Sequence, residues 1–201
     1  RKPIKIKYIS DLKHDLLRRD FTINTLCMDS SGKVLDILNV REDLDNKIIK
    51  TVSNPKIRIK EDSLRILRAI RFATILDFSI DKKTKKYLSK YGYLLKNLSG
   101  SRKKEELTKI FSSVNKEKGR ELLLEFKLDK YLGIDNLKDI TLCDDIIGVW
   151  SQLVFTEEYP FTKLEKENIS KIKELLNYKD LDEYTLYRYG LYLCTVIYDI
   201  R

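Results

Sequence analysis

The sequence is poor in residues that break helices and in residues that form disulfides or metal sites. It has only 7 glycines and 3 prolines among 201 residues, which favours long helices and few tight turns. Its three cysteines, Cys27, Cys143 and Cys194, are widely spaced and form no CxxC pair, so we expect buried thiols in a reducing compartment. The single histidine, His14, excludes a histidine-based metal cluster or an HD-type phosphohydrolase within this sequence.

Long apolar runs are also missing, whereas charge is plentiful and unbalanced. We find no run of 18 apolar residues, no signal peptide and no lipidation motif, so we expect a cytoplasmic protein with no membrane partner. The chain carries 40 Lys and Arg against 31 Asp and Glu, a formal net charge of +9. This excess favours a polyanionic partner through steering and counterion release.

The hydrophobic pattern predicts a mainly α fold with a small mixed α/β part at its start. An apolar, β-branched run at 21–28, a turn at 30–33 and a second run at 34–38 predict a β-hairpin. From Glu61 onward, apolar residues recur at three- and four-residue spacing, as in amphipathic helices. Helices are predicted near 62–76, 81–97, 101–114, 116–127, 143–155, 163–177 and 182–198.

The first of these helices carries a ladder of charge. After Asp62, three arginines follow at steps of three, namely Arg65, Arg68 and Arg71. On a helical wheel the apolar residues occupy one half, Asp62, Arg65 and Arg68 the other, and Arg71 the boundary. Each step rises about 4.5 Å along the axis. The pattern therefore predicts a core side and a functional side.

The ladder suits a ligand with a base at one end and phosphates at the other. A carboxylate accepts hydrogen bonds and a guanidinium donates them, so Asp62 beside Arg65 matches the amine and ring nitrogen of cytosine or adenine. Uracil and guanine would leave groups unpaired, at about 1–3 kcal/mol each. Arg68 and Arg71, about 9 and 13 Å along the helix axis from Asp62, could bind a triphosphate. From spacing alone, a solvated face with i,i+3 ion pairs is the more common arrangement.

A second charged motif precedes the predicted hairpin. The segment Arg18-Arg19-Asp20-Phe-Thr-Ile-Asn24 joins an arginine pair to an apolar run. Taken alone, such a cluster lies on the surface more often than it binds phosphate.

Together the two motifs resemble the class II tRNA nucleotidyltransferase and bacterial poly(A) polymerase family in order and spacing. The family carries Arg-Arg-Asp-Phe-Thr-x-Asn and later Glu-Asp-x-Leu-Arg-x-x-Arg-Ala-x-Arg-Phe, which stand here at 18–24 and 61–72. Further family signatures are matched at 36–44, 76–84 and 98–107, so the resemblance covers about the first 110 residues. It implies the C-terminal part of a mixed α/β nucleotidyltransferase head at 1–60, a helical neck at 61–115 and a helical body at 116–201.

The resemblance also implies roles for residues. Asp62 and Arg65 would form the template that selects CTP and ATP, and the phosphates would be held by Arg19, Arg68 and Arg71. Three further residues would support the pocket, namely Arg18, Asp20 and Asn24. The family transfers a nucleotidyl group to a tRNA or other RNA 3′ end with the help of Mg²⁺. The shared motifs leave CCA addition and poly(A) addition open. A non-catalytic, basic RNA-binding or assembly module is the other alternative.

The sequence departs from the family at the metal site. Family members have glycine-rich and Asp-x-Asp segments upstream of the arginine motif, but the seventeen residues before Arg18 contain neither. Other acidic pairs, at 43–45, 144–145 and 180–182, lack the preceding Gly-Ser turn. We therefore expect no metal ligand and no catalytic residue here beyond a minor role for Asp20. The chain is interpreted as a fragment, inactive without the N-terminal part of the same protein.

Overall fold

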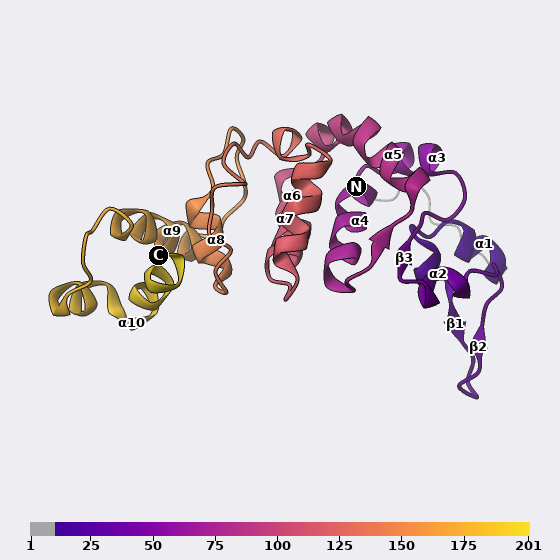
Figure 1. Ribbon diagram of the computed structural model, residues 1–201, viewed down its shortest axis with the longest axis horizontal. Coiled ribbons are helices and arrows are strands. Elements are labelled where there is room, and N and C mark those ends of the chain that lie inside the picture. The colour runs from indigo at the N-terminus through magenta and orange to yellow at the C-terminus, as the bar shows by residue number, and fades with distance from the viewer. Residues whose placement is uncertain (1–10) are drawn as a thin grey trace.

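The computed structural model describes residues 11–201, so the first ten residues of the predicted head lie outside the described part. Figure 1 shows the elements following one another along a single long axis, from the head at one end to α8–α10 at the other. The helices are α1 (Leu12–Leu17), α2 (Arg41–Asp45), α3 (Pro55–Glu61), α4 (Leu64–Ile75), α5 (Lys82–Tyr91), α6 (Gly100–Phe111), α7 (Lys116–Glu125), α8 (Ile146–Gln152), α9 (Lys163–Leu175) and α10 (Glu183–Ile200). The short strands are β1 (Cys27–Met28), β2 (Val34–Leu35), β3 (Ile48–Ile49) and β4 (Ser79–Ile80).

The mainly α fold with a small β-containing head is confirmed. The seven predicted helices correspond to α4 to α10, with α5 continuing into the 3₁₀ turn η2 (Gly92–Asn97) and α8 shorter than predicted. No helix in the described part of the chain is both long and apolar enough to cross a bilayer.

The predicted hairpin is present but shorter than expected. β1 pairs antiparallel with β2, with Cys27 opposite Leu35 and Met28 opposite Val34. The start of the predicted first strand is instead the 3₁₀ turn η1 (Thr22–Thr25). The physical reason is local, because the Thr25 hydroxyl donates to the Thr22 carbonyl at 2.7 Å, an alternative to strand pairing.

A parallel pairing that the sequence did not predict joins the head to the neck. β3 pairs with β4, with Ile48 opposite Ser79 and Ile49 opposite Ile80. The two strands lie on either side of α3 and α4 in the sequence, so their pairing closes this segment into one unit.

The charge ladder is interrupted at its start, which corrects the prediction of one helix from residue 62. Asn54 caps α3 and Pro55 occupies its first turn, so a separate helix runs up to Glu61. Asp62 is extended (φ −147°, ψ 107°), and its Oδ1 accepts from the Leu64 N–H at 3.1 Å. Asp62 therefore lies in the joint between α3 and α4, while all three arginines of the ladder lie on α4.

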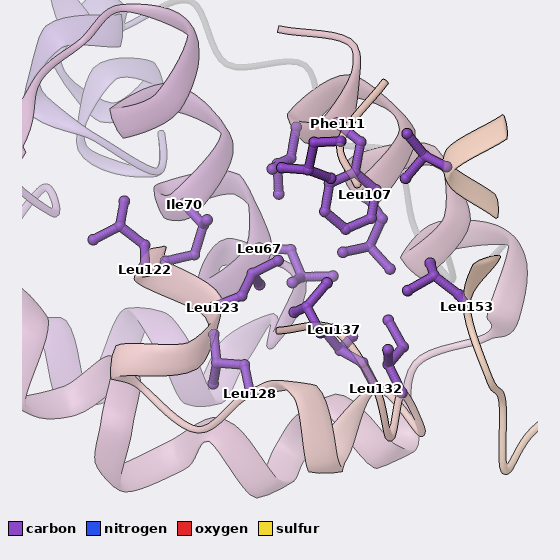
Figure 2. Packing of buried hydrophobic residues seen from close by; sticks show 14 of the residues in the cluster. Leu67, Ile70, Leu107, Phe111, Leu122, Leu123, Leu128, Leu132, Leu137 and Leu153 are labelled. Carbon is purple, nitrogen blue, oxygen red and sulfur yellow. The ribbon is translucent and has the colours of Figure 1, made fainter. Parts of the chain in front are cut away.

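The core forms where α4 packs against α6 and α7. Leu67 and Ile70 of α4 meet Leu107 and Phe111 of α6 and Leu123 of α7 in the cluster of Figure 2, and all five are at most 1% exposed. This packing fixes one side of α4 and directs its other side towards the head.

Candidate nucleotide-binding site

A cavity of about 660 Å³ lies where the head meets the start of α4 and α6. It is lined by Arg19, Asp20, Asn24, Asp62, Leu64, Arg65, Arg68, Phe72 and Arg102. Six of the eight residues predicted to bind or support a nucleotide are among them, although they come from segments far apart in the sequence.

One side of the cavity is built around Asp20. The Arg68 Nε donates to Asp20 Oδ2 at 2.6 Å, and the Asn24 amide donates to Asp20 Oδ1 at 2.8 Å. Burial opposes the ionisation of Asp20, but the contacts with Asn24 and Arg68 outweigh it and hold the pKa of this carboxyl below its usual range. Asp20 therefore stays charged and fixes the Arg68 guanidinium.

Arg19 is held beside this carboxylate. Its Nη1 donates to the Asn24 carbonyl at 2.6 Å and its Nη2 to Asp15 at 3.2 Å. The Arg68 guanidinium also lies 5.4 Å from the centre of the Phe72 ring. Two arginines and an aromatic face thus meet on the Asp20 side, an arrangement suited to a phosphate-bearing ligand.

The proposed base-reading pair, Asp62 and Arg65, also lines the cavity. Arg65 donates from Nη1 to the Arg58 carbonyl at 2.6 Å and to Glu61 Oε2 at 2.8 Å, and from Nη2 to the Arg18 carbonyl at 3.3 Å. These contacts use three of its five N–H donors. The Arg65 guanidinium is therefore fixed in direction while donors remain for a ligand.

Asp62 is held by a residue from another helix. Arg102 of α6 donates from Nη2 to Asp62 Oδ2 at 2.9 Å and to Oδ1 at 3.3 Å. The sequence interpretation missed Arg102 as a site residue, although the signature at 98–107 contains it. Its position in that signature was the available signal.

Arg58 was also missed. This buried arginine donates to the carbonyls of Leu17 and Arg19, at 2.6 and 3.0 Å, and to Glu61 at 2.6 Å. It thus joins α3 to the end of α1, and it contacts two residues that line the cavity, Arg19 and Arg65. The sequence held no signal for this role, because the carbonyls that Arg58 binds lie about 40 residues away.

Two predicted residues lie outside the cavity. Arg18 pairs with Asp15 on the surface of α1. Arg71 is buried against α6, where its Nη1 donates to Glu106 Oε1 at 3.0 Å, and its guanidinium lies 4.4 Å from the Phe72 ring centre. Burial raises the pKa of Glu106, and the nearby Arg71 opposes that rise.

The described residues do not fit a magnesium site. No group of three or more His, Cys, Asp or Glu side chains that could hold a metal occurs within residues 11–201. The acidic pairs considered from sequence have structural partners instead: Asp43 pairs with Lys50, Asp145 caps α8 and Asp182 caps α10. Asp20 accepts from Asn24 and Arg68, and it belongs to no group of carboxylates within residues 11–201 that could hold a metal.

Two protein-family models match the chain. Residues 1–50 match the "Poly A polymerase head domain", and residues 77–135 match the "Probable RNA and SrmB- binding site of polymerase A". Together they cover more than half of the chain.

Similar proteins agree with these matches. The CCA-adding enzyme of Enterococcus faecalis is 40% identical over 131 residues, which are 65% of this chain and 32% of that protein. The chain therefore spans about a third of that relative's length.

Solved structures share the fold. The crystal structure of the Bacillus stearothermophilus CCA-adding enzyme in complex with CTP superposes with a TM-score of 0.87 at 23% identity, over 97% of this chain and 55% of that one. A tRNA nucleotidyltransferase complexed with a primer tRNA and an incoming ATP analog gives a TM-score of 0.59 at 22% identity, over 96% and 51%. With its motifs, both matched models and its curated relatives in agreement, the chain belongs to the tRNA nucleotidyltransferase and poly(A) polymerase family.

Proposed function

We propose that this chain is the nucleotide-selecting and RNA-supporting part of a tRNA nucleotidyltransferase that adds CMP and AMP, from CTP and ATP, to the tRNA 3′ end. The observation that carries the proposal is that a single cavity is lined both by an acceptor and a donor, Asp62 and Arg65, and by two further arginines, Arg19 and Arg68.

Base selection follows from the hydrogen-bonding capacity of the pair. Asp62 offers carboxylate oxygens, and Arg65, which lines the cavity with its side chain 14% exposed, keeps two N–H donors beyond those bound to Arg58, Glu61 and Arg18. The amine and ring nitrogen of cytosine or adenine satisfy both residues. Uracil or guanine sets like groups against each other, and the resulting unpaired groups weaken binding by roughly tenfold to a hundredfold.

In this proposal, Arg19 and Arg68 bind the phosphates. Both guanidinium groups are partly exposed, at 39% and 31% of their side chains, so they can bind phosphate oxygens while retaining their protein partners. In this proposal, Asp20 and Asn24 orient these two arginines. Arg71 acts from behind the cavity, by holding α4 against α6.

Transfer itself needs more than these residues supply. Magnesium remains part of the proposed whole enzyme, but the described residues do not fit it, so no chemical step is assigned to a metal here. We expect the 201-residue chain alone to bind nucleotides without transferring them.

Its excess of positive charge suits tRNA as the partner. The naming of its relatives as CCA-adding enzymes favours CCA addition over poly(A) addition. The cytoplasm stays our prediction for its location.

The proposal is tested by measuring the affinities of the chain for CTP, ATP, UTP and GTP by isothermal titration calorimetry. We expect CTP and ATP to bind more tightly than UTP and GTP, and Arg65→Ala to remove most of this preference. Arg120→Ala is the matched control, because Arg120 also donates to a glutamate and a backbone carbonyl but lies on α7, away from the cavity. A folded wild-type chain that binds no nucleotide would instead favour a non-catalytic RNA-binding module.

A further inference from the structure

Of the proposed base-reading pair, Asp62 is the member that lies outside helix α4. It lies in the extended joint between α3 and α4, where its N–H donates to the Arg58 carbonyl at 3.5 Å and its carbonyl accepts from the Arg65 N–H at 3.1 Å. These backbone contacts do not orient its side chain, which is 40% exposed. Two contacts fix the carboxylate: the Leu64 N–H holds Oδ1, and the Arg102 Nη2 bridges Oδ1 and Oδ2. Of these, the Arg102 contact comes from a distant part of the chain.

The part of α6 that carries Arg102 is held in place by other contacts. The two residues that follow it on α6 pair with acidic residues of the segment before and at the start of α9: Lys103 binds Glu157 at 2.6 Å and Lys104 binds Glu165 at 2.7 Å. Lys103 is 1% exposed, and a side chain at Gly100 would meet the Glu158 carbonyl at 2.8 Å. The start of α6 therefore cannot move freely, and Arg102 reaches Asp62 from a fixed point.

The Asp62 and Arg102 pair forms a wall of the nucleotide cavity. Both side chains line this cavity and also a neighbouring cavity of about 340 Å³, which extends towards Lys60 and Asn97. A carboxylate held at this wall presents an acceptor in one direction. Released from Arg102, the carboxylate would keep only the Leu64 N–H contact at Oδ1. Oδ2 could then turn away from an approaching carbonyl oxygen, which would relieve the repulsion that rejects uracil.

We propose that Arg102 is a specificity-determining positioning residue, which holds the Asp62 carboxylate in the orientation that accepts a base amine and rejects a base carbonyl. This inference rests on the proposed function. It assigns discrimination to three residues, Asp62, Arg65 and Arg102. Arg102 makes no contact with the base and acts through Asp62.

The test compares CTP with UTP, because the two share a triphosphate and a ribose and a change in general electrostatics cancels in the ratio of their affinities. Arg102→Gln is expected to lower the preference for CTP over UTP about tenfold, because an Asp62 carboxylate that can turn aside no longer repels the uracil carbonyl. The urea midpoint is expected to stay unchanged, because the pair is 41% and 40% exposed.

Lys109→Gln is the matched control. Lys109 lies on the same helix, is 43% exposed and pairs with Glu105, so its loss removes the same charge without touching Asp62. This variant should keep the wild-type ratio. Arg102→Lys keeps the positive charge but loses the planar guanidinium, so a CTP/UTP affinity ratio between those of wild type and Arg102→Gln is expected. If Arg102→Gln does not fold, Arg102→Lys still tests the inference.

The outcomes separate the two proposals. A wild-type chain that shows no preference for CTP over UTP overturns the proposed function and this inference with it. A wild-type preference that persists in full in both Arg102→Gln and Arg102→Lys overturns only this inference. A purely structural role would lower the affinities for CTP and UTP alike and leave their ratio unchanged, which also overturns it.

Discussion

Replacement of Arg71 by methionine should destabilise the protein far more than it weakens nucleotide binding. Arg71 and Glu106 are joined at 3.0 Å, and their side chains are 10% and 4% exposed. Arg71→Met leaves the Glu106 carboxylate buried without its charged partner. Breaking a buried ion pair in this way costs about 3–5 kcal/mol, so we expect a fall of that size in the free energy of unfolding at pH 7.

The loss should depend on pH, with a sign that follows from Glu106. Burial raises the pKa of Glu106 above its unfolded value, so the folded state retains this proton to higher pH. Stability therefore falls as pH rises through the raised pKa. Without Arg71, which opposes the rise, the pKa of Glu106 moves up further. The cost of Arg71→Met should be largest at neutral pH and should shrink towards pH 4.5, the ordinary value for glutamate.

Urea unfolding followed by far-UV circular dichroism, at pH 7 and pH 5, measures both effects. The double variant Arg71→Met/Glu106→Met replaces the whole pair by apolar side chains, and we expect its stability to lie within about 1 kcal/mol of wild type. It should also bind CTP within about threefold of wild type, because Arg71 lies outside the cavity. A loss below about 1 kcal/mol in the single variant would refute the reasoning from burial. A stable double variant with at least tenfold weaker CTP binding would show that Arg71 contacts the nucleotide, as its motif predicts.

Two further substitutions test the packing around the cavity, again by urea unfolding. Arg58→Met removes two hydrogen bonds that join α3 to the carbonyls of Leu17 and Arg19, and a third to Glu61 within α3, and it should cost roughly 3 kcal/mol. Lys56→Met, at an exposed position of the same helix, should change stability little, and equal effects of the two substitutions would contradict the role given to Arg58. Gly119→Ala places a Cβ against the Ile110 side chain and 2.9 Å from the Thr74 hydroxyl, and should lower the free energy of unfolding by about 1–3 kcal/mol. Glu121→Ala, on the exposed side of α7, should be nearly neutral, and a Gly119→Ala variant as stable as wild type would show that α7 can move away from α4.

The helices of the neck and body could be predicted from sequence because their signals are local. Apolar residues at three- and four-residue spacing identified α4 to α10, and α9 begins at a capping box formed by Thr162 and Glu165. The head was harder. Its strands are two residues long, and the β3 and β4 pairing joins residues about 30 positions apart, which no local pattern specifies.

The sequence by itself determined the chemistry of the site: arginines and acidic residues at fixed steps, and a second motif that supplies Arg19, Asp20 and Asn24. Only the tertiary structure decided which of these groups face one another. Arg68 meets Asp20 from 48 positions away, Arg102 meets Asp62 from 40 and Arg71 meets Glu106 from 35. A helical wheel gives the direction of a side chain but not the segment that packs beside it. Because α6 covers the boundary of α4, the last arginine of the ladder is buried in an ion pair, while the first two line the cavity.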